Sequence, residues 1–129
     1  MTFIAVIDDD SAYLSMMQEL LNDEGYRTFT QLMAAGAPTR IAEAQPDLVI
    51  LDVRMESAHA GLSLLDRLRA DQRTCHIPVI VCSADVSTLR EKQETLTRQG
   101  CAVLEKPFDL EKLLDLVRDK AGPARNANL

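Results

Sequence analysis

The sequence of 129 residues has no tryptophan, few cysteines and no long apolar run. No stretch approaches the roughly 18 apolar residues that a membrane-spanning helix needs, so we expect no membrane insertion. The first residues lack the basic region of a signal peptide, and the three cysteines are not spaced as zinc ligands. We therefore expect a cytoplasmic protein with reduced thiols, with Cys82 in the core and Cys75 exposed.

Basic residues are also in short supply. Lysine and arginine number 14 against 20 aspartates and glutamates, which gives a formal net charge of −6. This balance argues against direct nucleic-acid binding, because proteins with that function neutralise phosphates with basic patches. Apolar residues nevertheless make up 47% of the chain, which suits one globular domain of this length.

Apolar segments of two kinds alternate along the chain. Short apolar runs typical of strands buried on both faces occupy 3–7, 48–51, 77–82 and 102–104, and a weaker alternating stretch covers 26–30. Helical spacing of apolar residues follows at 10–24, 62–68, 86–98 and 110–120, and the Ala-rich, weakly patterned segment 33–45 is expected to hold a helix after Pro38. Five strand–helix units of this kind predict a five-stranded parallel sheet with helices on both faces.

The alternation predicts a single domain over residues 1–121. The last segment, 122–129, has no apolar pattern and is expected to be a flexible C-terminal tail. In an open parallel sheet, ligands bind beyond the carboxyl ends of the strands, so the residues at those ends deserve a functional interpretation.

Polar residues from four distant segments follow the predicted strands: Asp8, Asp9 and Asp10, then Asp52, Ser83 and Lys106. Crowded carboxylates repel one another, and a hard cation such as Mg²⁺ or Mn²⁺ relieves the repulsion. A carboxylate can also attack phosphorus, while a lysine and a hydroxyl hold phosphate oxygens. The set therefore predicts a site for a divalent cation and a phosphoryl group.

Each residue also has an ordinary structural interpretation. Asp10 or Ser11 could cap the first helix, and Asp52 could simply close its strand. Ser83 could cap the following helix, and Lys106 could be a surface lysine. One such residue at a strand end could occur by chance, but all of them at successive strand ends are much less expected by chance. The prediction therefore rests on the ordered set.

The segments around these residues resemble, in sequence order, the four signatures of response-regulator receiver domains of two-component signalling. They are Ile7-Asp8-Asp9-Asp10-Ser11, Leu51-Asp52-Val53-Arg54-Met55, Val81-Cys82-Ser83-Ala84 and Glu105-Lys106-Pro107-Phe108. The resemblance extends over nearly the whole chain. It implies a flavodoxin-like (βα)₅ fold with strand order 2-1-3-4-5.

By the same resemblance, Asp52 would accept a phosphoryl group from a histidine kinase or a phosphotransfer protein. Asp9 and Asp52 would bind Mg²⁺ directly, Asp8 would act through water, and the backbone carbonyl of Arg54 would be a further ligand. The chain would be a signalling phosphoacceptor, and not an enzyme beyond catalysing its own phosphoryl transfer and slow dephosphorylation.

The resemblance also assigns Ser83 and Lys106 to contacts with the phosphoryl group, and it implies a cis peptide bond before Pro107. Arg54 and Asp85 lie two residues beyond the acceptor and the hydroxyl residue, where receivers place side chains that tune hydrolysis. We predict an ion pair between them that shields Asp52 from water; two unpaired surface charges are the alternative.

Three positions depart from the common pattern of the family. Glu56 stands where the family usually has proline, and Gly61 comes one residue late, so the loop between them is altered and an extra acid is expected beside the site. Val103 occupies the position at which many receivers carry a rotating tyrosine or phenylalanine. The usual switch, in which Ser83 is coupled to that aromatic ring, therefore cannot operate in its standard form.

Other functions compete with the receiver interpretation. A receiver-like interaction module could keep the fold and the metal site and signal by docking alone, without phosphorylation. A phosphohydrolase of the haloacid dehalogenase type needs a second aspartate where this chain has Arg54, and no glycine-rich loop for a nucleotide or flavin follows the first strand. The output partner stays unknown, and the face built from residues 84–120 is the contact surface expected from the family.

Overall fold

The computed structural model describes residues 2–57 and 59–123. Within these residues it contains five strands, β1 (Phe3–Ile7), β2 (Arg27–Gln31), β3 (Leu48–Asp52), β4 (Val79–Ser83) and β5 (Cys101–Glu105). The five helices of the same residues are α1 (Ser11–Asp23), α2 (Ala37–Ala44), α3 (Ala60–Ala70), α4 (Val86–Arg98) and α5 (Leu110–Ala121).

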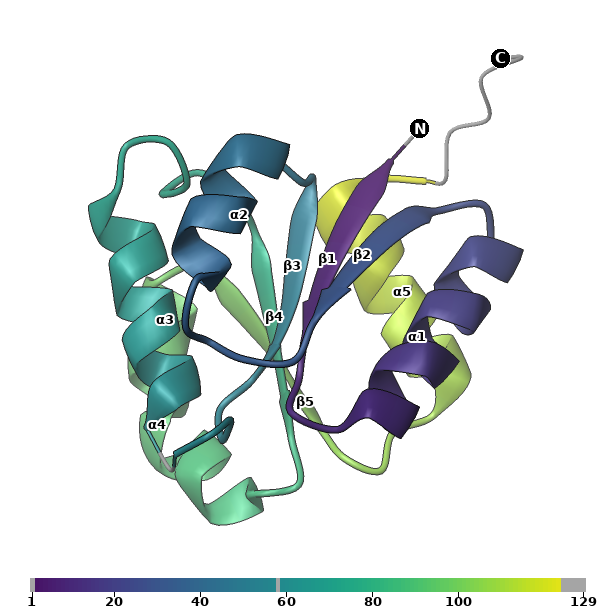
Figure 1. Cartoon of the computed structure of the whole chain (residues 1–129). Helices are drawn as coiled ribbons and strands as arrows, with labels where there is room; N and C mark the ends of the chain where they lie inside the picture. Colours follow the sequence, from purple (N-terminus) through teal and green to yellow (C-terminus); the bar gives the residue numbers. More distant parts are fainter. Residues whose placement is uncertain (1, 58, 124–129) are drawn as a thin grey trace.

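All five strands are parallel and form one sheet in the order β2-β1-β3-β4-β5 (Figure 1). Helices α1 and α5 cover one face of the sheet, and α2, α3 and α4 cover the other (Figure 1). This arrangement confirms the predicted flavodoxin-like fold. In the described part of the chain, no helix combines the length and apolarity needed to cross a membrane.

The central strands are buried on both faces, which explains their continuous apolar runs. In β1, Ala5 and Ile7 pack in the cluster under α2, α3 and α4, whereas Ile4 and Val6 pack in the cluster under α1 and α5. Each fully buried aliphatic side chain contributes about 1.5–3 kcal/mol to folding. Cys82 belongs to the second cluster, as predicted, and burial raises the pKa of its thiol to about 12.

The boundaries of some elements differ from the predicted ones. Strand β4 begins after Ile77 and Pro78 and ends on Ser83, because proline has no N–H for the ladder and because strand pairing continues past the last apolar residue. Helix α2 begins at Ala37 and includes Pro38 in its first turn, where proline's missing N–H costs no helical hydrogen bond, whereas the sequence placed the helix after Pro38. The apolar pattern therefore locates each element but not its ends.

The residues directly after α5 lie at the amino ends of β1 and β2. The hydroxyl of Tyr26 donates to the carbonyl of Gly122, and the hydroxyl of Thr2 donates to the carbonyl of Pro123, both at 3.1 Å. These two residues open the segment expected to be a flexible tail. Its remainder, 124–129, lies outside the described residues.

Gly61 allows α3 to approach the strand that carries Asp52. A Cβ atom on Gly61 would lie 2.0 Å from the carbonyl oxygen of Asp52 and 2.4 Å from that of Val53. The N–H of Gly61 donates to the carbonyl of Val53 at 3.0 Å. Only glycine fits this position without moving the backbone behind the acceptor residue.

We predict that Gly61→Ala lowers the free energy of unfolding by about 3 kcal/mol, because the new methyl group collides with backbone atoms. Gly36→Ala is the control, since Gly36 has left-handed backbone angles and its new Cβ would meet only the flexible side chain of Gln31, at 3.8 Å, so that about 1 kcal/mol of backbone strain is expected. Urea unfolding followed by circular dichroism measures both. Equal losses would contradict the close approach of α3.

Candidate functional site

The carboxyl ends of four strands bring the predicted residues together. Asp8 and Asp9 follow β1, Asp52 and Ser83 are the last residues of β3 and β4, and Lys106 follows β5. An open hollow of about 460 Å³ lies here, lined by Asp9, Asp52, Arg54, Ser83, Ala84 and Asp85. Segments that are far apart in sequence thus converge because parallel strands end at the same edge.

Lys106 joins two of the carboxylates. Its Nζ donates to Oδ2 of Asp8 at 2.6 Å and to Oδ2 of Asp52 at 3.0 Å. The side chains of Lys106, Asp8 and Asp52 are 17%, 3% and 12% exposed, so these charge-assisted bonds are shielded from water. The peptide bond between Lys106 and Pro107 is cis, as expected. The ammonium group is close enough to contact a group attached to the Asp52 carboxylate.

Burial and charge act against each other at the Asp8–Lys106 pair. Burial raises the pKa of Asp8 above its usual value, although Lys106 and the N–H of Asp10 stabilise the charged carboxylate. Burial also opposes the charged form of Lys106, but the hydrogen bonds with Asp8 and Asp52 outweigh it, and the pKa of Lys106 is raised. The ammonium is therefore held charged, and it compensates part of the negative charge.

The donors that line the hollow fit a hard divalent cation. Asp9 and Asp52 both line the hollow, and the N–H of Arg54 donates to Oδ1 of Asp52 at 3.0 Å. Within residues 2–57 and 59–123, no three acidic, histidine or cysteine side chains are grouped closely enough to hold an ion. Mg²⁺ typically takes one or two carboxylates and keeps several waters, so Asp9, Asp52 and the Arg54 carbonyl could hold it.

The ion pair expected at the entrance is present. Nη1 of Arg54 lies 3.6 Å from Oδ2 of Asp85. Oδ1 of Asp85 accepts from the N–H of Thr88 at 3.2 Å, and Oδ2 accepts from the Thr88 hydroxyl at 2.8 Å. Asp85 is thus the N-cap of α4, and Ser83 is not: its Oγ accepts from the N–H of Asp85 at 3.1 Å. The prediction that Asp10 caps the first helix is confirmed, because its side chain accepts from two N–H groups at the start of α1.

Glu56, the extra acid expected beside the site, is not among the residues that line the hollow. Its carboxylate accepts hydrogen bonds from the backbone N–H groups of Ala34 and Ala35, at 2.9 and 3.2 Å. The bond from Ala34 is the main reason that the pKa of Glu56 is lowered. Sequence alone did not reveal this partner, because the loop between β2 and α2 is distant along the chain.

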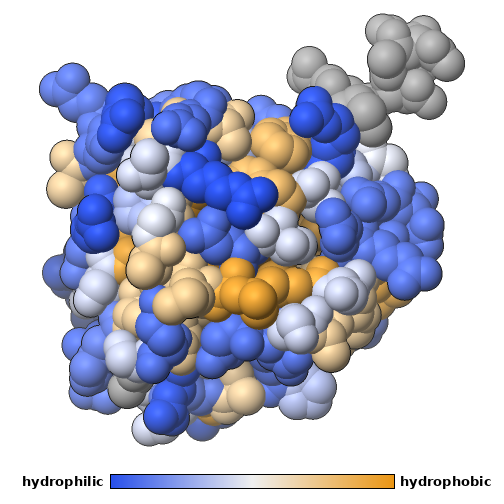
Figure 2. Space-filling view, viewed as in Figure 1, coloured by the Kyte–Doolittle hydropathy of each residue, from blue (hydrophilic) through white to orange (hydrophobic). Residues whose placement is uncertain are grey.

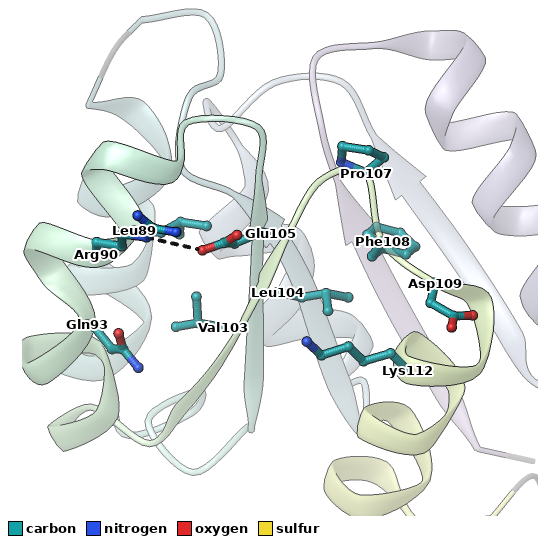
Figure 3. A pocket seen from close by; sticks show the side chains of 10 residues that line it. All are labelled: Leu89, Arg90, Gln93, Val103, Leu104, Glu105, Pro107, Phe108, Asp109 and Lys112. Atoms are coloured by element: carbon teal, nitrogen blue, oxygen red, sulfur yellow. Dashed lines mark ion pairs between the residues drawn. The ribbon is translucent and has the colours of Figure 1, made fainter.

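Val103 faces a second hollow of about 470 Å³ between α4, β5 and α5. Figure 3 shows Val103 pointing toward α4 and Leu104 pointing toward α5 from opposite sides of β5. An ion pair at 3.6 Å between Arg90 and Glu105 lies beside Val103 (Figure 3). A small aliphatic side chain thus occupies the place where many receivers carry an aromatic ring.

The sequence analysis missed Tyr13, in the first turn of α1. The Nζ of Lys106 lies 3.9 Å from the centroid of the Tyr13 ring, a cation–π contact in addition to the two carboxylate bonds. The hydroxyl of Tyr13 is buried close to the thiol of Cys82, and burial raises the pKa of Tyr13. The available signal was an aromatic residue one helical turn beyond Asp9.

Comparison with known proteins agrees with this arrangement. The family model of the response regulator receiver domain matches residues 4–118. The DNA-binding dual master transcriptional regulator RpaA of Synechocystis is 31% identical over 115 residues, which cover 89% of this chain and 47% of RpaA. The chain therefore spans about half the length of that relative.

Solved structures share the fold. The chemotaxis protein CheY4 of Vibrio cholerae has a TM-score of 0.81 and 25% identity, over 93% of this chain and 98% of CheY4. The receiver domain of the sensor histidine kinase PA1611 of Pseudomonas aeruginosa, solved with a magnesium ion coordinated in its active site cleft, has a TM-score of 0.80 and 21% identity, over 94% and 98% of the two chains. The fold, the strand-end residues and the family match agree, and the chain belongs to the response regulator receiver domain family.

Proposed function

We propose that this receiver domain accepts a phosphoryl group on Asp52 in a reaction that depends on Mg²⁺. The observation that carries the proposal is the Lys106 ammonium 3.0 Å from the Asp52 carboxylate, with Asp9 and Ser83 close by at the same edge of the sheet. We infer that the donor is a histidine kinase or a phosphotransfer protein. The chain then acts as a signalling phosphoacceptor that promotes its own phosphoryl transfer and slow dephosphorylation.

In the proposed reaction, a carboxylate oxygen of Asp52 attacks the phosphorus of a phosphohistidine. The phosphorus–nitrogen bond breaks, its electron pair stays on the imidazole, which takes up a proton, and Asp52 becomes an acyl phosphate. Lys106 neutralises the transferred oxygens, and the hydroxyl of Ser83 donates to one of them. Asp9, Asp52 and the Arg54 carbonyl would hold Mg²⁺, which would supply the positive charge that such transfers need together with correct positioning.

We infer that Ser83 passes the signal to the start of α4 without a switch aromatic residue. The Oγ of Ser83 accepts from the N–H of Asp85, which caps α4. A turn of Ser83 toward the phosphoryl group would therefore disturb the start of α4 with no aromatic ring at Val103. We propose that the output is a changed protein-contact face within residues 84–120, which binds a partner still to be identified.

Incubation with acetyl phosphate and Mg²⁺ tests phosphoryl transfer. The wild-type protein should gain the mass of one phosphoryl group by intact mass spectrometry, and Asp52→Asn should not. Asp23→Asn, at the opposite end of α1, should be modified like the wild type. A wild type that binds Mg²⁺ but gains no mass would instead support an interaction module that signals by docking alone.

Thermal unfolding tests the cation ligands. A ligand that binds only the folded state stabilises it by about 2.7 kcal/mol at a hundredfold excess over its Kd, so Mg²⁺ should raise the melting temperature. The rise should be smaller in Asp9→Ala than in the wild type or in Asp23→Ala. Identical rises in all three proteins would remove Asp9 from the set of ligands.

The lifetime of the acyl phosphate tests the ion pair at the entrance. We expect Arg54→Ala to shorten the lifetime several-fold, because the guanidinium no longer screens Asp52 from attacking water. Arg67→Ala, which removes the same charge from α3, is the control, and loss of the phosphoryl mass with time is the measurement. Equal lifetimes in the three proteins would show that the pair does not shield Asp52.

A further inference from the structure

Glu56 connects two loops that belong to different strand–helix units. It lies after β3, and its Oε1 and Oε2 accept from the N–H groups of Ala34 and Ala35, which lie between β2 and α2. Two bonds from one carboxylate to consecutive amides restrain both the position and the orientation of the contact, and bonds to an ionised acceptor are stronger than neutral ones.

The β2–α2 loop, residues 32–36, is itself held in place. The side-chain amide of Gln31 donates to the carbonyls of Met33 and Ala35, at 3.1 and 3.2 Å. The guanidinium of Arg40 donates to the carbonyl of Thr30 at 3.0 Å and to the Gln31 side chain at 3.2 Å. The amides that bind Glu56 are therefore presented by a network that starts from both β2 and α2.

On the other side, Glu56 is separated from Asp52 by only three residues. The N–H of Arg54 donates to the Asp52 carboxylate at 3.0 Å, and the side chain of Met55 is buried in the core at 5% exposure. The N–H of Met55 also donates to the carbonyl of Ser57 at 3.1 Å. A segment this short and this restrained cannot move at Arg54 without a response at Glu56.

We propose that Glu56 is a positioning residue that couples the cation site at Asp9 and Asp52 to the β2–α2 loop. The proposal rests on the proposed function in one respect, namely that Mg²⁺ binds at this site. When Glu56 holds the loop, the Arg54 carbonyl is already ordered for the cation; when the contact is broken, only a fraction of molecules is competent and the apparent affinity falls. Linkage requires that Mg²⁺ strengthens the Glu56 contact by the same factor.

The coupled loop also carries an apolar surface. Leu32 and Met33 are 48% and 51% exposed, and Figure 2 shows a hydrophobic patch over this part of the molecule. The loop lies on the β2 side of the sheet, away from the hollow between α4, β5 and α5 (Figure 1). Cation binding would therefore change the ordering of the β2–α2 loop and of the apolar surface that it carries.

Two measurements on Glu56→Ala test the coupling: amide hydrogen exchange at Ala34 and Ala35 by NMR, and the Kd for Mg²⁺ by calorimetry. Without metal, exchange at these two amides should be about three- to tenfold faster than in the wild type, as expected for one or two modest hydrogen bonds. The Kd should rise by a similar factor. Added Mg²⁺ should slow the exchange in the wild type but not in the variant.

Matched variants separate the contact from the charge. Glu56→Gln keeps an acceptor oxygen and should give intermediate values, whereas Glu91→Ala, which removes an exposed acid from α4, should behave like the wild type. An unchanged Kd in Glu56→Ala, or exchange at Ala34 and Ala35 that ignores Mg²⁺ in the wild type, would overturn the coupling and leave the proposed function intact. A wild type that binds no Mg²⁺ would overturn both.

Discussion

The arrangement of the site depends on the balance of charge around Lys106. Three carboxylates meet at one edge of a parallel sheet, and two of them, Asp8 and Asp52, share the ammonium of this lysine at 2.6 and 3.0 Å. Burial makes the ionised form of Asp8 costly, and the lysine stabilises that charged carboxylate. The ring of Tyr13 holds the same ammonium from the first turn of α1. The ammonium of Lys106, from the segment after β5, thus contacts residues of α1 and residues at the ends of β1 and β3.

The other acidic residues near the site are neutralised or directed elsewhere. Asp85 caps α4 and pairs with Arg54, and Glu56 binds two backbone N–H groups of the β2–α2 loop. Asp9 remains as the carboxylate that lines the hollow without a hydrogen bond or ion pair to the described residues. Some of the acids behind the net charge of −6 are therefore paired within the protein, whereas Asp9 is not. The negative charge of Asp9 is left at the hollow, where it suits the cation that we propose.

Much of the fold and the site could be predicted from the sequence. Continuous apolar runs such as 48–51 identify strands buried on both faces, and polar residues directly after such runs mark the edge of a parallel sheet. The ends of β4 could not be placed, because strand pairing extends to Ser83, past the apolar residues. The contact between Tyr13 and Lys106 was also missed, since a tyrosine in a helical apolar pattern is ordinarily a core residue.

The sequence by itself determined which residues meet, because right-handed strand–helix units bring every strand end to one edge whatever the details of the packing. Only the tertiary structure decided how their charges are paired. The partners of Glu56 and Lys106 are set by distances across loops that no local pattern encodes. The extra acid expected beside the site became a link to the β2–α2 loop, since unpaired backbone N–H groups there offered the carboxylate better partners than the crowded acidic hollow.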